Sequence, residues 1–165
     1  MAASIPFTLV PFRESDYTDY QSLTTDPRIM EMITGQALDE TESRAHFDRV
    51  LQQNQIAPGF GNFKIINEDN NAFIGLAKLV LHNPDDREVE IGFMLLETYW
   101  GKGIASAATR QLIDFARTKP QLLRVKAILD PLNKASRKIL VGEGFVSEFV
   151  GEIDGLPGEV MNLVL

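Results

Sequence analysis

A short glycine-rich stretch, Trp100-Gly101-Lys102-Gly103-Ile104-Ala105, holds the residue types with the clearest chemical meaning in this chain. It follows an extended apolar run and opens a segment with helical periodicity that continues to about Arg117. The first N–H groups of a helix have no partners within the helix, and they favour an anion such as phosphate. The two glycines remove side chains that would block close approach, and the lysine adds a positive charge. The stretch therefore predicts a phosphate-binding turn between a strand and a helix.

Composition and charge limit the other kinds of site. The chain of 165 residues has no cysteine, which excludes thiol nucleophiles and zinc–thiolate sites, and two histidines make a histidine metal cluster implausible. We therefore expect no metal. The formal net charge of −7 argues against nucleic acid as a partner and is compatible with a cationic amine substrate. With no apolar run near the length of a membrane span and no signal-peptide pattern, we expect no membrane association and a cytoplasmic location.

Periodicity and turn residues predict the elements in the first half of the chain. A strand over 7–12 is followed by a helix from Ser15-Asp16 to about Leu23 and by a second helical piece over 28–33 that Asp26-Pro27 begins. A longer helix begins at Thr41 and ends before Pro58-Gly59. Its expected buried stripe consists of Ala45, Phe47, Val50 and Leu51. Strands over 62–67, 72–81 and 88–95 follow, joined by short polar turns, and should pair antiparallel.

The pattern then changes to a strand–helix–strand unit over 88–95, 103–117 and 124–129. A helical crossover of this kind usually makes its two strands parallel. A helix over 133–143 and a closing hairpin of 145–151 with 159–165, turning around Asp154-Gly155, complete the chain. The sum predicts one α/β (α+β) domain over 1–165 with a mixed, mostly antiparallel sheet.

Three features in this order carry a resemblance to a known family. They are the strand ending Glu90-Ile91-Gly92-Phe93-Met94-Leu95, the glycine-rich turn, and Asn133-Lys134-Ala135-Ser136 followed by Gly144-Phe145. The chain resembles the GNAT superfamily of N-acetyltransferases, and most nearly the RimJ/RimL type, which includes the ribosomal-protein N-terminal acetyltransferases. The opening stretch from Leu9 to Asp16 and the pair Asp26-Pro27 also resemble that type.

The resemblance implies a single-domain GNAT fold, with a splayed parallel strand pair and flanking helices, and acetyl-CoA as the cosubstrate. In the family the glycine-rich motif binds the pyrophosphate mainly through backbone amides, and the preceding strand pairs with the pantetheine arm. The expected cofactor-binding residues are therefore Phe93, Met94 and Leu95 for pantetheine, Trp100, Gly101, Lys102, Gly103, Ile104 and Ala105 at the turn, and Asn133 as the family asparagine.

The implied reaction is direct attack of an amine on a thioester, which needs a proton acceptor, donors for the oxyanion and a proton for the thiolate. Glu90 is the candidate base, directly or through a water; the alternative is a solvated or structural carboxylate. Many GNAT enzymes carry a tyrosine four residues before the Gly-Phe glycine, where this chain has Leu140. In the RimL-like group a serine follows the family asparagine by three residues, and Ser136 matches it, so the resemblance implies Ser136 as the group at the thioester or the departing thiolate. Its alternative role is helix capping.

The sequence leaves the acceptor open between a protein N-terminal amine and a small-molecule amine. It also leaves the oligomeric state open between monomer and homodimer. A non-catalytic acyl-CoA-binding or sensing module is the alternative function, which Leu140 keeps open and Glu90 with Ser136 disfavours. A P-loop nucleotide enzyme is poorly supported because Gly101-Lys102 is not followed by serine or threonine.

Overall fold

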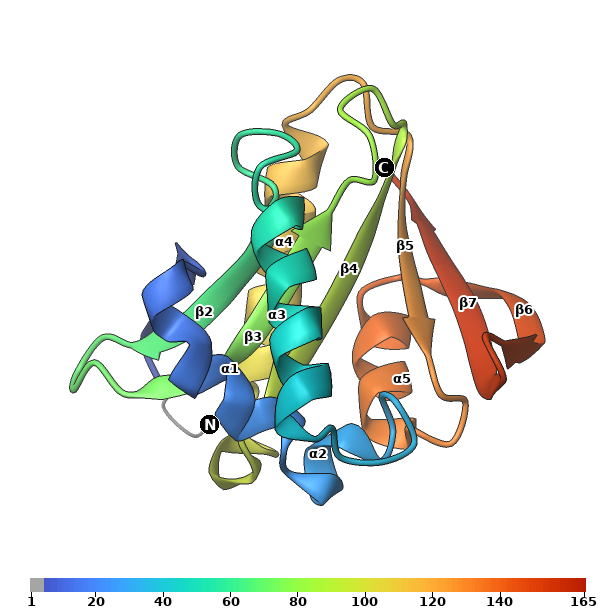
Figure 1. The fold of residues 1–165 in the computed structure, drawn as a ribbon. Coiled ribbons are helices and arrows are strands. Elements are labelled where there is room, and N and C mark those ends of the chain that lie inside the picture. Colours follow the sequence, from blue (N-terminus) through green and yellow to red (C-terminus); the bar gives the residue numbers. More distant parts are fainter. Residues whose placement is uncertain (1–4) are drawn as a thin grey trace.

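The computed structural model describes residues 5–165, which build one seven-stranded sheet with helices on both faces. The strands lie in the order β1-β2-β3-β4-β5-β7-β6 (Figure 1). Neighbouring strands run antiparallel except β4 and β5, which are parallel, as the crossover predicts. The strand bounds are β1 Phe7–Pro11, β2 Gly61–Asn67, β3 Phe73–Val80, β4 Glu88–Leu95, β5 Arg124–Leu129, β6 Val146–Ile153 and β7 Leu156–Val164.

The helices are divided between the two faces of the sheet. Figure 1 shows α1 and α3 in front of the sheet and α4 behind it. Their bounds are α1 Tyr17–Thr24, α2 Pro27–Met30, α3 Glu40–Gln53, α4 Ile104–Arg117 and α5 Lys134–Gly142, with single 3₁₀ turns η1 Glu14–Asp16 and η2 Glu97–Tyr99. Within residues 5–165, no helix is both long and apolar enough to span a membrane. The expected α/β architecture is confirmed.

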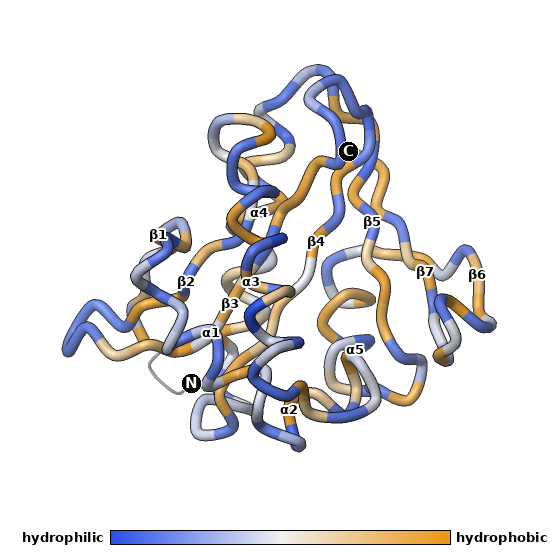
Figure 2. The backbone as a smooth tube through the Cα atoms, viewed as in Figure 1, coloured by the Kyte–Doolittle hydropathy of each residue, from blue (hydrophilic) through white to orange (hydrophobic). Residues whose placement is uncertain are grey.

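Alternation along the strands produces two hydrophobic cores, one on each face. Val89, Ile91 and Leu95 of β4 pack with α4 in the larger core, where Ala108 and Leu112 are buried. Intervening side chains of the same sheet belong to the smaller core under α1, α2 and α3. Figure 2 shows the corresponding apolar tube along the central strands and the more polar surface loops. Packed side chains therefore cover both faces of the central strands, and this packing holds β4 and β5 in place.

The parallel pair separates part of the way along its length. The register runs from Glu88↔Arg124 to Ile91↔Ala127 and then stops, although β4 continues to Leu95 and β5 to Leu129. Beyond that point β4 stays paired with β3, and β5 stays paired with β7. Each strand therefore presents an unpaired edge to the gap, which confirms the expected splay near Gly92.

Three details differ from the sequence predictions. Helix α2 ends at Met30 rather than at 33, because the N–H groups of Ile33, Thr34 and Gly35 all converge on the Met30 carbonyl. Ala45 was expected to be buried and is exposed, because the buried stripe of α3 is Ser43, Phe47 and Val50. The β6–β7 hairpin is longer and tighter than predicted, since Asp154 and Gly155, at φ of 51° and 82°, form a two-residue turn.

Candidate active site

The glycine-rich turn lies between β4 and α4 and leaves open space at both glycines. Gly101 and Gly103 have φ of 72° and 79°, a left-handed conformation that disfavours other residues. A Cβ built on either one would meet no atom within 4 Å. Gly103 is the N-cap of α4 and no side chain caps that helix, so its first N–H groups are available to an anion. The residues present therefore fit a pyrophosphate at this turn.

Trp100 joins the turn to the end of β4. Its indole Nε1 donates to the Leu95 carbonyl at 2.9 Å, and 46% of the residue is exposed. Of the three residues expected to pair with pantetheine, Leu95 thus already has its carbonyl engaged. Phe93 and Met94 lie on the part of β4 that no longer pairs with β5.

A cavity of about 320 Å³ lies beside this turn, and we call it the turn-side cavity. Its walls come from the α2 region, the end of β4, the turn and the start of α5. Its lining includes Arg28, Ile29, Phe93, Trp100, Gly101 and Ser136. Most of the lining is apolar, as is usual for a ligand pocket with a few polar groups.

A second cavity of about 520 Å³ occupies the gap between the splayed strands, and we call it the hairpin-side cavity. It is lined by residues 91–93 of β4, 127–129 of β5 and the turn between β6 and β7. Phe93, Asn133 and Ser136 line both cavities. Met32 and Ile33 on the opposite wall also line both cavities, so the two cavities adjoin where β4 and β5 separate.

The start of α5 places Asn133 and Ser136 at this meeting point. The Asn133 side-chain oxygen accepts a hydrogen bond from the Ser136 backbone N–H at 3.2 Å. Asn133 is therefore the N-cap of α5, and the alternative in which the Ser136 side chain caps the helix is not what the structure shows. Leu140, one turn further on, is buried and lines the hairpin-side cavity with a side chain that has no proton to give.

Glu90 lies on β4 two residues before Gly92 and is not among the residues that line either cavity. Lys78 Nζ on β3 contacts its Oε2 at 2.7 Å, and His82 Nε2 lies 3.8 Å from its Oε1. Burial raises the pKa of the Glu90 carboxyl, but the charge and hydrogen bond of Lys78, with help from His82 and Lys126, outweigh it and leave the pKa below its ordinary value. Glu90 is therefore an ionised, weakly basic carboxylate.

Gly92 makes room for this ion pair. A Cβ built at Gly92 would come within 2.8 Å of Lys78 Cε. Glu88 lies on the same face of β4, but its carboxylate pairs with Arg124 and with Lys126 Nζ, the latter at 3.1 Å. Glu88 thus pairs directly with Arg124 and Lys126, whereas Glu90 pairs directly with Lys78.

The structure adds charged and titratable residues that sequence reasoning did not place at the site. Glu31, Asp130 and Asp154 line the hairpin-side cavity together with His46, and no lysine or arginine is among its lining residues. Burial and then the charge of Arg49 lower the pKa of the His46 imidazole, against a smaller opposite effect of Glu42. These residues come from four separate segments, so no local sequence pattern could have grouped them.

No set of three or more acidic or histidine side chains within residues 5–165 is arranged to hold a metal ion. Lys102, Gly103 and Ile104 belong to the turn but do not line either cavity, whereas Trp100, Gly101 and Ala105 do. The roles of the individual site residues stay predictions.

Comparison with known proteins gives the family. Residues 7–146 match the acetyltransferase (GNAT) domain. An uncharacterized N-acetyltransferase, p20 of Bacillus licheniformis, is 26% identical over 124 residues, which are 75% of this chain and 70% of that protein. The chain belongs to the GNAT acetyltransferase family, and the fold and family expected from the sequence are confirmed.

Solved structures share the fold across nearly the whole chain. Spermidine N-acetyltransferase from Vibrio cholerae, solved with CoA and spermine, superposes with a TM-score of 0.77 at 20% identity, covering 96% of this chain and 95% of that one. RimL, a ribosomal L7/L12 α-N-protein acetyltransferase solved with CoA, gives 0.77 at 18% identity, covering 99% and 98%. Likenesses at this identity concern the fold, so the finer assignment to the RimJ/RimL type is not confirmed.

Proposed function

We propose that this chain transfers an acetyl group from acetyl-CoA to a primary amine by direct attack in a ternary complex. The observation that carries the proposal is the meeting of two cavities at Phe93, Asn133 and Ser136, where the parallel strands separate. One cavity adjoins the phosphate turn and the other adjoins acidic side chains. A thioester entering from one side and an amine from the other would meet at these residues, and such positioning is itself a large part of catalysis.

The turn residues would hold the acyl carrier. The backbone N–H groups of the turn would hold the pyrophosphate, since Gly101 and Gly103 leave open space there. The free edge of β4 at Phe93 would offer backbone groups to the pantetheine amides, whereas the alternation along the strand directs those of Met94 toward β3. Acetyl-CoA supplies the acetyl group as an activated thioester. Asn133, whose oxygen caps α5, would reach the carrier with its amide N–H groups.

Ser136 and Glu90 have the proposed chemical roles. The Ser136 hydroxyl lines both cavities and would donate a hydrogen bond at the thioester or to the departing thiolate. Glu90 would receive the amine proton through a water, since its own side chain does not line the cavities. Its pairing with Lys78 keeps the carboxylate ionised.

The acidic lining of the hairpin-side cavity favours a cationic acceptor. Glu31, Asp130 and Asp154 supply negative charge, and no lysine or arginine lines the cavity. Its volume of about 520 Å³ lies within the range of small-molecule sites. We therefore favour a small amine with a further positive charge over a protein N-terminus, which is the acceptor that a RimJ/RimL-like type would imply.

A thiol-release assay with acetyl-CoA and a panel of amines tests the proposal. The panel contains a polyamine, an aminoglycoside, a neutral monoamine of similar size and a short peptide with a free N-terminus. We expect release of CoA with the polycationic amines at kcat/KM well above that with the neutral amine. Acetyl-CoA binding without turnover of any amine would favour the acyl-CoA-binding module instead, and preference for the peptide would support the RimJ/RimL-like type.

A further inference from the structure

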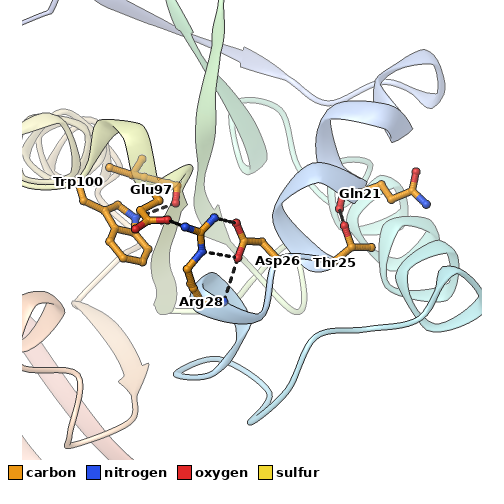
Figure 3. A network of polar contacts seen from close by, with 7 residues as sticks. Gln21, Thr25, Asp26, Arg28, Glu97 and Trp100 are labelled. Carbon is orange, nitrogen blue, oxygen red and sulfur yellow. Dashed lines mark hydrogen bonds and ion pairs between the residues drawn. The ribbon is translucent and has the colours of Figure 1, made fainter.

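A polar network joins α2 to the turn that follows β4 (Figure 3). Arg28 Nη2 donates to Asp26 Oδ2 at 3.1 Å, and Arg28 Nε donates to Asp26 Oδ1 at 3.3 Å. The remaining terminal nitrogen, Nη1, forms an ion pair with Glu97 Oε2 in η2. One guanidinium therefore connects two carboxylates from segments about 70 residues apart in the chain.

Both ends of this link are fixed to the body of the protein. On one side, Asp26 is the N-cap of α2 and accepts the Arg28 backbone N–H at 2.9 Å. On the other side, η2 leads directly to Trp100, whose indole is hydrogen-bonded to Leu95 of β4. Arg28 thus ties the start of α2 to the structure that carries the phosphate turn.

Arg28 also lies at the turn-side cavity. It is the single charged residue among those that line this cavity, and Trp100 and Gly101 are among its co-lining residues. Ile29, Met32 and Ile33 of the same segment form an apolar wall, and the last two also line the hairpin-side cavity. The position of α2 therefore sets the width of the space in which the acyl carrier would lie.

We propose that Arg28 is a positioning residue for the acyl carrier. By holding α2 against η2, it keeps the wall of Ile29, Met32 and Ile33 closed on the turn-side cavity. The inference rests on the proposed function, because it takes the ligand of this cavity to be acetyl-CoA. In this role the ion pair between Arg28 and Glu97, and not the charge of Arg28 alone, supports binding of acetyl-CoA.

Arg28 could instead bind a phosphate of the ligand directly, and the effect of removing Glu97 on acetyl-CoA affinity would then have the opposite sign. In that case the Glu97 carboxylate competes with the phosphate for the guanidinium, and its removal strengthens binding. In the linking role, Glu97 is as necessary as Arg28, although it is acidic and would itself repel the anionic ligand.

The experiment is a double-mutant cycle read by calorimetric titration with acetyl-CoA. We expect Arg28→Met and Glu97→Gln each to raise the Kd about twofold to fivefold, and the double variant to raise it no further than either single change. In steady-state assays the KM for acetyl-CoA should rise while kcat at saturating acetyl-CoA is preserved, a split that general misfolding would not produce.

Arg110→Met is the matched control. Arg110 has the same side-chain exposure as Arg28, 64%, and pairs with Glu143 at 2.8 Å, but it lines neither cavity. Its acetyl-CoA affinity should equal that of the unchanged protein. Unchanged affinity in Arg28→Met, or stronger binding in Glu97→Gln, would overturn the inference alone. A failure of the unchanged protein to bind acetyl-CoA would overturn the proposed function as well.

Discussion

Asn133 Oδ1 accepts the Ser136 backbone N–H at 3.2 Å, so the asparagine caps α5 and the serine hydroxyl is not needed for that purpose. The capping turn presents Ser136 to both cavities from the first turn of a helix whose Leu140 is buried. A rigid element therefore carries the hydroxyl, and this arrangement separates the chemistry of Ser136 from the stability of the helix.

Replacement of Ser136 should accordingly affect turnover and leave stability nearly unchanged. We expect Ser136→Ala to lower kcat about tenfold or more, because a hydrogen-bond donor at the thioester is lost, with little change in unfolding free energy. Asn133→Ala should lower unfolding free energy by about 1 kcal/mol through loss of the cap. Denaturant unfolding and steady-state kinetics of both variants give the comparison. A stability loss in Ser136→Ala with normal turnover would reverse the two assignments.

The phosphate turn should be sensitive to charge at Gly103. Gly103→Asp places a carboxylate where the helix N-terminus would meet pyrophosphate, and we expect acetyl-CoA binding to weaken by more than about 2 kcal/mol. Gly155→Asp is the control, since Gly155 also has a left-handed φ, of 82°, and open space at its Cβ, but lies in the β6–β7 turn. Because the φ angles of the two glycines are nearly equal, a difference in acetyl-CoA affinity between the variants, measured by calorimetry, reports the effect of the carboxylate at the turn. Equal acetyl-CoA affinities of Gly103→Asp and Gly155→Asp would contradict the assignment of this turn as the pyrophosphate site.

The fold was predictable because its signals are local. Alternating apolar residues mark the strands, and Asp26 and Gly103 mark helix starts by their own conformational preferences. The parallel direction of β4 and β5 follows from a helical crossover, which is a connection rule and needs no alignment. The splay of the two strands near Gly92, in contrast, was expected from the family resemblance and not from a local pattern.

The rest of the site depends on packing between distant segments. The pairing of Glu90 with Lys78 follows from strand register, in which Lys78 lies opposite Gly92, and this register was not read from the sequence. His46 is partly buried on α3, and it lines the hairpin-side cavity only because α3 crosses the sheet there. The contact between Arg28 and Glu97 likewise arises only when α2 closes on η2.

His46 should make acceptor binding sensitive to acid. Its pKa lies below the ordinary value, so the imidazole is neutral at physiological pH and gains a proton only as the pH falls through that lowered pKa. The added charge would partly cancel the carboxylates of Glu31, Asp130 and Asp154 and weaken binding of a cationic amine. We expect kcat/KM for the amine to fall about threefold to tenfold through this titration, and His46→Asn to lack that component. At pH 8 the two proteins should agree, and a component that persists in the variant would exclude His46 as its source.

Glu90 and Lys78 should set the pH dependence of kcat for acetyl transfer. If Glu90 receives the amine proton, Glu90→Gln should lower kcat about 10²-fold, with a smaller loss at high pH where the amine deprotonates without help. Glu88→Gln is the control, because Glu88 lies on the same face of β4 with its own partners, Arg124 and Lys126, and it should retain turnover.

Lys78→Met tests the sign of the coupling at Glu90. With the lysine in place the carboxyl pKa is lowered, so the ion pair stabilises the fold above the ordinary carboxyl pKa and is lost as the pH falls through the lowered value. Burial is already the largest single influence on the Glu90 pKa, and without the opposing effects of the lysine the pKa should rise. The acidic limb of kcat should therefore move to higher pH in Lys78→Met and disappear when Glu90→Gln is added. An acidic limb of the kcat profile that is unchanged by both substitutions would mean that solvent takes the proton. The protein would then work by holding the amine and the thioester together.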